Sequence, residues 1–310
     1  MPIRHDIVHT TLYRYREPVT FGEHRVMFRP LDSHDQRVLA TDLQVSPQAL
    51  VRLIQDTHSN SIALVQPLQA ATELKIVCSF TIEYADSPGP VAPLTAAAEY
   101  WPMAYSMAER LDLDQYLRPH YDDPQGKLTA WACQFVQGDS RTGTRELLQS
   151  MNRHIGQNLR YVVRDEEGTQ LPLETLELGS GSCRDYALLM MEAARRLGVA
   201  ARFVSGYLYD ASLDGGGEAM TGSAFTHAWL QVYLPGAGWV AFDPTNNLLG
   251  GSQLIRVAVV RDPALAAPVS GSWYGEPGAY LGMTASVQVS RRQTDEAPAM
   301  VAPDGDSPDT

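Results

Sequence analysis

Residues 179–210 hold the stretch that decides the fold, GSGSCRDYALLMMEAARRLGVAARFVSGYLYD. Apolar side chains recur after Cys183 at the spacing of one helix face, at Tyr186, Leu189, Met190, Ala193 and Leu197. Gly198 follows them as a helix stop. The pattern therefore predicts a helix that begins at Cys183, followed by a strand in VAARFVSGYLYD.

Cys183 is a candidate nucleophile because of its place at the start of this helix. Free backbone N–H groups and the helix dipole favour a negative charge there, and the thiolate is the reactive form of cysteine. The backbone N–H of Cys183 would also face a developing oxyanion. Ser182 is a candidate helix cap, and Gly179 and Gly181 allow a substrate to approach closely.

A predicted hairpin downstream supplies two partners for the cysteine. FTHAWLQVYL and WVAFD predict two strands joined by the tight connection PGAG, with His227 near the start of the first strand and Asp243 at the end of the second. Antiparallel pairing brings these ends to the same edge. A register with Gln231 opposite Trp239 would set His227 beside Asp243, which would orient the imidazole and leave its other nitrogen for Cys183.

Each of these residues also has a structural interpretation when it is taken alone. A cysteine often begins a helix without reacting, an Asp-Pro pair often ends a strand, and single histidines are common. The combination carries more weight, because nucleophile, base and orienting group each fall on the element where the mechanism needs them.

The first 85 or so residues predict β structure, with short, often alternating segments separated by EPVTFGE, LDSHD and DTHSNS. This spacing is typical of a small sandwich or barrel. A Pro/Gly-rich break near residue 85 suggests a boundary. We expect a β-rich N-terminal domain at 1–90, a catalytic core at 91–292 and a disordered acidic tail at 293–310.

The chain also resembles a known family, the bacterial transglutaminase-like proteins. Their core has a G-x-C-x-D helix start, an R-x-V-x-G-Y strand, then H-A-W and G-W-x-x-x-D-P, and GSCRD, RFVSGY, HAW and GWVAFDP stand here in that order. YRYREPVTFGEHRVMFRPLDSHDQRVL is similar to their β-rich N-terminal region. The resemblance covers nearly the whole chain except the tail. It implies an α+β fold, a β-sandwich-like domain followed by a papain-like core whose catalytic helix packs on an antiparallel sheet.

The resemblance also implies roles for individual residues. Carried over by motif, Cys183 is the nucleophile, His227 the general base and acid, and Asp243 the orienting group. Asp185 matches an acidic position that we interpret as structural, and Trp229 and Trp239 match packing aromatics. For the side-chain donor of the oxyanion hole we choose Tyr161, with Trp131 second.

The implied chemistry is that of a cysteine-dependent amide hydrolase or acyltransferase that acts on peptide-like amides through a thioester. A water acceptor gives a peptidase or amidase, which we rank slightly first, and an amine acceptor gives a transglutaminase. The alternative is a non-catalytic binding module of the same fold. In a third version the N-terminal β region docks partners that the core modifies.

Composition narrows the other possibilities. The net charge of −12 argues against a nucleic-acid partner. No apolar run is long enough for a membrane span or a secretory signal, so we expect a cytoplasmic protein without a membrane partner. The resemblance implies that it is a bacterial enzyme. No EF-hand-like or C-x-x-C pattern occurs, so we expect neither metal nor other cofactor. Cys78 and Cys133 are expected to be buried packing residues. The sequence leaves the oligomeric state open.

One glycine-rich segment just before His227 keeps two interpretations. DASLDGGGEAMTGSA, residues 210–224, predicts a flexible loop. It would serve either as a lid over the cleft or as a tolerant surface loop.

Overall fold

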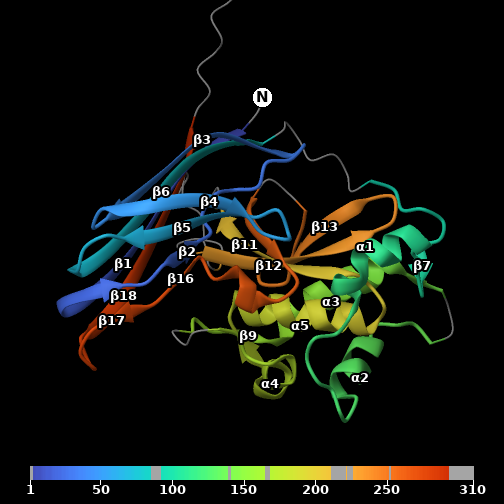
Figure 1. Ribbon diagram of the computed structural model, residues 1–310. Helices are drawn as coiled ribbons and strands as arrows, with labels where there is room; N and C mark the ends of the chain where they lie inside the picture. The colour runs from blue at the N-terminus through green and yellow to red at the C-terminus, as the bar shows by residue number, and fades with distance from the viewer. Residues whose placement is uncertain are drawn as a thin grey trace, which may run out of the picture.

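The computed structural model describes residues 3–84, 92–138, 141–164, 168–210, 221, 226–250 and 253–292. The expected tail and most of the expected loop at 210–224 lie outside these residues. Every helix among the described residues is too short or too polar to span a bilayer. Two β-sheets on one side and a helix-covered sheet on the other make up the molecule (Figure 1).

The two sheets form the expected N-terminal sandwich. The first has the order β17 (Trp273–Tyr274), β1 (Ile3–Phe21), β6 (Ala71–Tyr84) and β3 (Gln36–Ser46), with β18 (Tyr280–Arg292) also on β1. The second has the order β16 (Val269–Ser270), β2 (His24–Val26), β5 (Ser61–Pro67) and β4 (Ala49–Gln55). Their facing side chains share one apolar core that includes Ile7, Val65, Ile76 and Phe80.

The end of the chain returns to this sandwich. β18 runs antiparallel to β1 from Arg4 opposite Arg292 to Tyr15 opposite Tyr280, and β16 and β17 pair with β2 and β1. Residues 269–292 therefore lie in the N-terminal sheets, although the sequence analysis assigned them to the core. The boundaries themselves stay a prediction.

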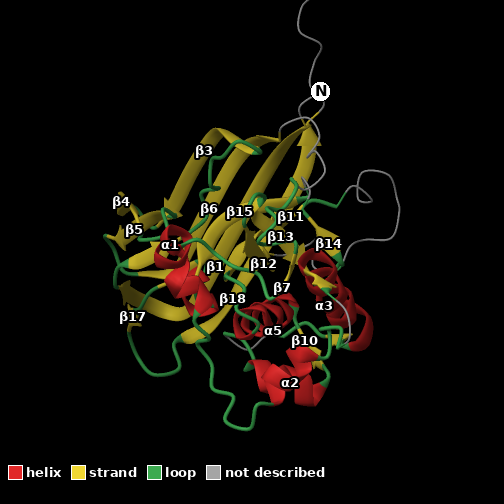
Figure 2. Cartoon of the chain, turned by 90° about the vertical axis from the view of Figure 1, so that its right-hand side faces the viewer, coloured by secondary structure: helices red, strands yellow, loops and turns green. Residues whose placement is uncertain are grey.

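The second half of the chain forms one five-stranded antiparallel sheet with helices against it. The strand order is β14 (Leu248–Leu249), β13 (Gly238–Asp243), β12 (Thr226–Leu234), β11 (Ala201–Leu208) and β15 (Leu254–Val260). α5 (Cys183–Arg196) packs on β12 and β11. Around it lie α1 (Met107–Leu117), α2 (Lys127–Cys133), α3 (Thr144–Asn158) and α4 (Pro172–Leu178). Figure 2 shows α1, α2 and α3 about α5.

Short elements complete the core. β7 (Tyr100–Trp101) pairs with β8 (Thr142–Gly143), β9 (Arg160–Tyr161) pairs in parallel with β10 (Ser180–Gly181), and a 3₁₀ turn covers Pro263–Ala266. The pair β9–β10 leads directly into α5, so it fixes the approach to Cys183.

α5 is buried on nearly every side, not on one face as its periodicity predicts. Twelve of its 14 residues are buried, among them Asp185, Glu192 and Arg195. The sheet covers one side and α2, α3 and α4 cover much of the rest. Arg195 is tolerated there because its guanidinium pairs with Glu192 at 2.8 Å and donates to the carbonyls of Ala201 and Arg261.

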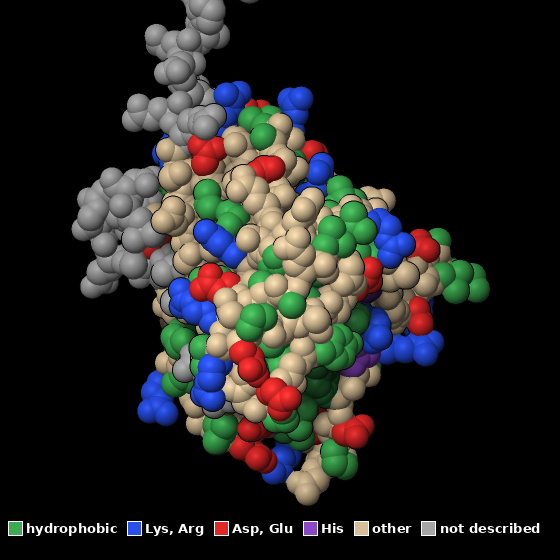
Figure 3. Space-filling view, turned by 60° about the vertical axis from the view of Figure 1, so that its left-hand side comes forward, with side chains coloured by type: hydrophobic (Ala, Val, Ile, Leu, Met, Phe, Trp, Pro, Cys, Tyr) green, Lys and Arg blue, Asp and Glu red, His purple; other side chains and the backbone are tan. Residues whose placement is uncertain are grey.

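The sandwich is bonded to the core sheet through polar side chains. Asn60 donates to the Val259 carbonyl at 2.8 Å and accepts from the Val259 N–H at 2.9 Å. His9 Nδ1 lies 2.8 Å from the Tyr207 hydroxyl, and Tyr207 and Ile255 are part of the sandwich core. The two parts therefore share a buried interface. On the face that Figure 3 draws, on the sandwich side, charges of both signs are interspersed with hydrophobic side chains.

The two other cysteines differ in their surroundings. Cys78 is buried, as expected, but Cys133 is exposed, so that expectation was wrong. α2 is only seven residues long and buries Leu128 and Ala132, which are four positions apart on one face. Cys133 falls off this face at the helix end.

Candidate active site

Cys183 occupies the first position of α5, as the sequence predicts. Ser182 precedes it with an extended backbone, φ −88° and ψ 176°. The N–H of a residue in the first helical turn has no intrahelical partner. Gly181 fits closely below this turn, because a Cβ there would lie 2.8 Å from the Asp185 Cβ.

Asp185 holds the start of α5, which agrees with its expected structural role. Its fully buried carboxylate accepts hydrogen bonds from the Ser182 N–H at 2.7 Å and the Ser182 hydroxyl at 2.8 Å. The Gln170 N–H at 2.7 Å and Arg164 Nη1 at 2.9 Å complete the set. One carboxylate thus ties the helix start to the segment that precedes α4.

His227 and Asp243 are brought together as predicted, but through a different register. Nε2 of His227 lies 2.8 Å from Oδ2 of Asp243, and both side chains are fully buried. Gln231 pairs with Ala241, not with Trp239, so the predicted register was wrong by two residues. The register sets His227 diagonally from Asp243 on the same face, a separation that long side chains bridge.

A residue that the sequence analysis missed completes the surroundings of Asp243. Asn246 Nδ2 donates to Asp243 Oδ2 at 2.9 Å, and the Thr245 N–H donates to Asp243 Oδ1 at 2.9 Å. The Asn246 amide also bonds the backbone of Thr221 in both directions, at 3.1 and 3.2 Å. The signal for Asn246 is its place three residues after the aspartate, in DPTNN, where asparagine commonly forms turns.

The free nitrogen of His227 belongs to the pair with Cys183. Nε2 lies against Asp243, and Nδ1 has no hydrogen-bond partner among the described residues. Burial opposes ionisation of the Cys183 thiol, but the neighbouring His227, with help from the Ala228 N–H, lowers its pKa. Burial also opposes the charged imidazole, yet Asp243 and Cys183 raise the pKa of His227.

These opposite shifts favour one charge state, a thiolate beside an imidazolium. Burial raises the pKa of Asp243, but His227 and Asn246 outweigh it and lower that pKa, so the third member is ionised. The arrangement can deliver a nucleophilic sulfur and a nearby proton. No group of three or more His, Cys, Asp or Glu side chains is placed to hold a metal ion within the described ranges.

Tyr161 lies against the cysteine. It pairs with Gly181 in the β9–β10 bridge, two residues before Cys183. Burial raises the pKa of the Tyr161 phenol, and the neighbouring negative Cys183 raises it further. The phenol thus stays protonated and is able to donate a hydrogen bond.

The other aromatics have packing roles. Trp229 is fully buried and its ring stacks near His227, with centroids 6.0 Å apart. Trp239 lies under the Arg202 guanidinium at 4.0 Å. The ring of Trp131, the second choice for an oxyanion donor, contacts Phe135 and His154.

Comparison with known proteins agrees with this geometry. Residues 129–244 match the transglutaminase-like superfamily, and residues 5–83 match the bacterial transglutaminase-like N-terminal region. The chain thus carries a transglutaminase-like core of papain type behind a bacterial transglutaminase-like N-terminal region, which confirms the resemblance and the fold inferred from the sequence.

Two proteins that this chain resembles over most of its length share a quarter or less of its residues. An uncharacterized protein of Mycobacterium leprae is 25% identical over 91% of this chain and 97% of its own length. A solved protein of Cytophaga hutchinsonii, named as a candidate cysteine protease, superposes with a TM-score of 0.67 at 19% identity over 96% of this chain and 93% of its own. A protein-glutamine gamma-glutamyltransferase of Pseudomonas aeruginosa is 35% identical over 69 residues, which are 22% of this chain and 10% of that protein.

Proposed function

We propose that the protein is a cysteine-dependent amide hydrolase or acyltransferase that acts on peptide-like amides through a thioester. The observation that carries the proposal is the buried pair of His227 and Asp243, 2.8 Å apart, together with the buried Cys183 at the start of α5, whose pKa His227 lowers. The pKa of Cys183 is lowered and that of His227 is raised. These shifts favour a thiolate beside an imidazolium, the charge state that such a mechanism uses.

The first half of the reaction forms the acyl enzyme. The Cys183 sulfur attacks the amide carbon, and the electron pair of the carbonyl moves to its oxygen. The backbone N–H of Cys183 and the Tyr161 hydroxyl are the donors suited to that oxyanion. The tetrahedral adduct then collapses, the C–N bond breaks, and His227 gives its proton to the departing nitrogen.

The second half releases the acyl group. A water or an amine attacks the thioester carbon while neutral His227 takes its proton, and the C–S bond breaks to restore the thiolate. Water yields a carboxylic acid, and an amine yields a new amide. The short stretch shared with a protein-glutamine gamma-glutamyltransferase supports a test of the amine branch beside hydrolysis.

Glutamine turnover provides the test. The full chain is incubated with benzyloxycarbonyl-Gln-Gly, with or without monodansylcadaverine, and ammonia and product masses are measured. Ammonia release that Cys183→Ala abolishes supports the proposal, and the product mass separates acid from amide. A parallel peptide-amide library covers peptidase and amidase activity.

Cys133 supplies a matched control because it is exposed and lies outside the site. Cys133→Ala should keep full activity. Absence of turnover on every amide, together with alkylation of Cys183 that is no faster than that of Cys133, would overturn the proposal in favour of a non-catalytic binding module.

A further inference from the structure

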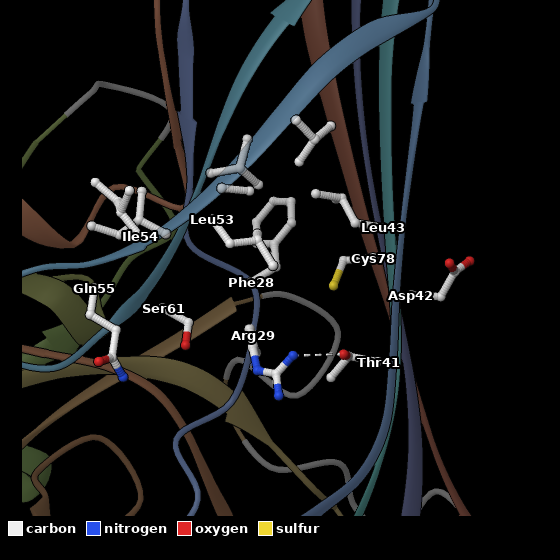
Figure 4. A pocket seen from close by; sticks show the side chains of 14 residues that line it. Phe28, Arg29, Thr41, Asp42, Leu43, Leu53, Ile54, Gln55, Ser61 and Cys78 are labelled. Atoms are coloured by element: carbon white, nitrogen blue, oxygen red, sulfur yellow. Dashed lines mark hydrogen bonds between the residues drawn. The ribbon is translucent and has the colours of Figure 1, made fainter.

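A crevice opens in the sandwich on the edge opposite β17 and β16. β3 and β4 are the last strands of their sheets, and each pairs with one neighbour only among the described residues. They are linked at one end, where Ser46 is followed closely by Ala49, and a cavity of about 590 Å³ lies between them (Figure 4). This volume is in the range of small-molecule sites.

At the apolar end of the crevice, side chains that face the interior of the sandwich are exposed to solvent. Val51 and Leu53 pair with Val65 and Ala63, which are buried in the sandwich core, so they face the same interior. Val51 is nevertheless 46% exposed and Leu53 67% exposed. Leu43 faces them from β3, opposite Cys78. The two sheets diverge here, and aliphatic side chains stay uncovered.

The other end of the crevice is polar and carries one positive charge. Figure 4 shows Arg29, Thr41, Gln55 and Ser61 along one side, with Phe28, Leu43 and Leu53 beyond them. Arg29 Nη1 donates to the Thr41 hydroxyl at 3.0 Å, and no ion pair of Arg29 occurs within the described part of the chain. Asp42 also lines the cavity, but its carboxylate is turned to the far side of β3 (Figure 4) and accepts a hydrogen bond from Gln44.

The residue at the floor of the cavity, Cys78, carries no negative charge that would pair with Arg29. Cys78 lies at the floor, and burial raises the pKa of its thiol to about 12, so the sulfur is neutral in the physiological range. The cavity therefore offers an aliphatic wall, a neutral floor and a single cation with a hydroxyl beside it.

We propose that this crevice binds a linear aliphatic chain with an anionic head group, a carboxylate or a phosphate. The chain lies between Phe28, Leu43 and Leu53, and the head group accepts hydrogen bonds from Arg29 and Thr41. The net charge of −12 makes unspecific attraction of an anion an inadequate explanation for such binding. This site is independent of the function proposed for Cys183.

The test is calorimetric titration of the full chain with sodium decanoate and, separately, with decyltrimethylammonium, both below their micelle concentrations. We expect saturable binding of decanoate and at least about 10-fold weaker binding of the cation. Arg29→Gln should weaken decanoate about 10-fold, the loss expected for one charged hydrogen bond. Leu53→Asp should abolish measurable binding, and its exposed position lets the fold remain intact.

Arg52→Gln is the matched control. Arg52 lies on β4 beside Leu53 but points to the opposite face of the strand. It pairs with Leu64, and its guanidinium lies 3.5 Å from Glu23. The same chemical change there should leave decanoate affinity unaltered. Equal affinity for both amphiphiles, or decanoate binding that survives both Arg29→Gln and Leu53→Asp, would overturn the proposal.

Two further ligands separate the sources of the head group. Decyl phosphate compares a phosphate with a carboxylate on the same chain length. Sedimentation with phosphatidylglycerol vesicles tests the same chemistry when it is held in a bilayer. Saturable binding of either ligand that Arg29→Gln weakens supports the site. Binding of extended apolar peptides along the edge of β4 with no response to decanoate would overturn it.

Discussion

The side-chain amide of Asn246 donates to the same oxygen of Asp243 that lies against the imidazole of His227, at 2.9 and 2.8 Å respectively. Asn246 therefore sets the orientation of the carboxylate, and through its two bonds to Thr221 it also anchors the chain six residues before His227. A side chain that acts on a histidine through its carboxylate partner is a positioning residue.

Asn246→Ala should lower kcat about 10-fold with little change in KM, because the Asp243 carboxylate would lose its fixed orientation. The pH at which Cys183 becomes reactive should rise in this variant, an effect that a loss of stability alone would not produce. Steady-state kinetics and iodoacetamide labelling measure both. Asn158→Ala, at the exposed end of α3, is the control and should change neither.

Alkylation of Cys183 should begin at lower pH than that of an ordinary thiol, whose pKa is about 8.5. The thiolate–imidazolium pair exists between the lowered pKa of Cys183 and the raised pKa of His227, so reactivity should be flat across that window. His227→Ala removes the interactions that lower the thiol pKa and leaves the burial that raises it. In that variant Cys183 should react more slowly than Cys133 at pH 7, as peptide mapping after iodoacetamide labelling will show.

The same shifts predict how the pair contributes to stability. The depressed pKa of Cys183 contributes fully above the unfolded thiol value and is lost as pH falls through the folded value. The raised pKa of His227 contributes fully below the unfolded imidazole value and is lost as pH rises through the folded one. Urea denaturation of wild type and His227→Ala across pH measures the difference, and parallel curves would contradict the ionised pair.

Tyr161→Phe should lower kcat about 100-fold if the phenol supports the oxyanion, the usual loss for one such donor. Labelling of Cys183 should continue, because the Cys183–His227 pair is retained. Trp131→Phe is the comparison variant, since its ring contacts lie with Phe135 and His154. Equal kcat for Tyr161→Phe and wild type would remove Tyr161 from the mechanism.

Asp185→Ala should lower the free energy of unfolding by about 3–5 kcal/mol, the cost of removing one partner from a buried charged network. It would leave the Ser182 N–H, the Gln170 N–H and Arg164 Nη1 without the carboxylate that each now contacts. Asp185→Asn, which keeps one acceptor oxygen, should lose less. Urea titration followed by circular dichroism measures both, and a loss below about 1 kcal/mol for the alanine variant would contradict this role.

The sequence predicts most of the core because its signals are local. A helix that starts at Cys183 and a hairpin from His227 to Asp243 follow from periodicity and turn residues within short windows. The hairpin register was wrong for a reason that the sequence contains. Leu234 pairs with Gly238 and leaves three residues in the loop, whereas Gln231 opposite Trp239 would leave Pro235 alone to reverse the chain.

Two other features have no local signal. Nothing near Tyr280 indicates that β18 pairs with β1, because the alternation of side chains that predicts a strand does not predict which strand it pairs with. Asn246 is likewise one polar residue among several after Asp243 until its bonds to Asp243 and Thr221 are seen. The burial of Glu192 and Arg195 depends on the helices that surround α5, which periodicity alone does not describe.

The ladder between β1 and β18 has a consequence for synthesis on the ribosome. β1 leaves the ribosome early and can pair with β6 once Ala71–Tyr84 has been synthesised. The other edge of β1 stays unpaired until Tyr280–Arg292 has been synthesised. The nascent protein thus carries an open strand edge through most of translation, and such edges pair readily with other chains. A stop codon between Cys183 and Tyr280 would leave this edge of β1 unpaired for good. Such truncated products still contain Cys183 but should accumulate in the insoluble fraction.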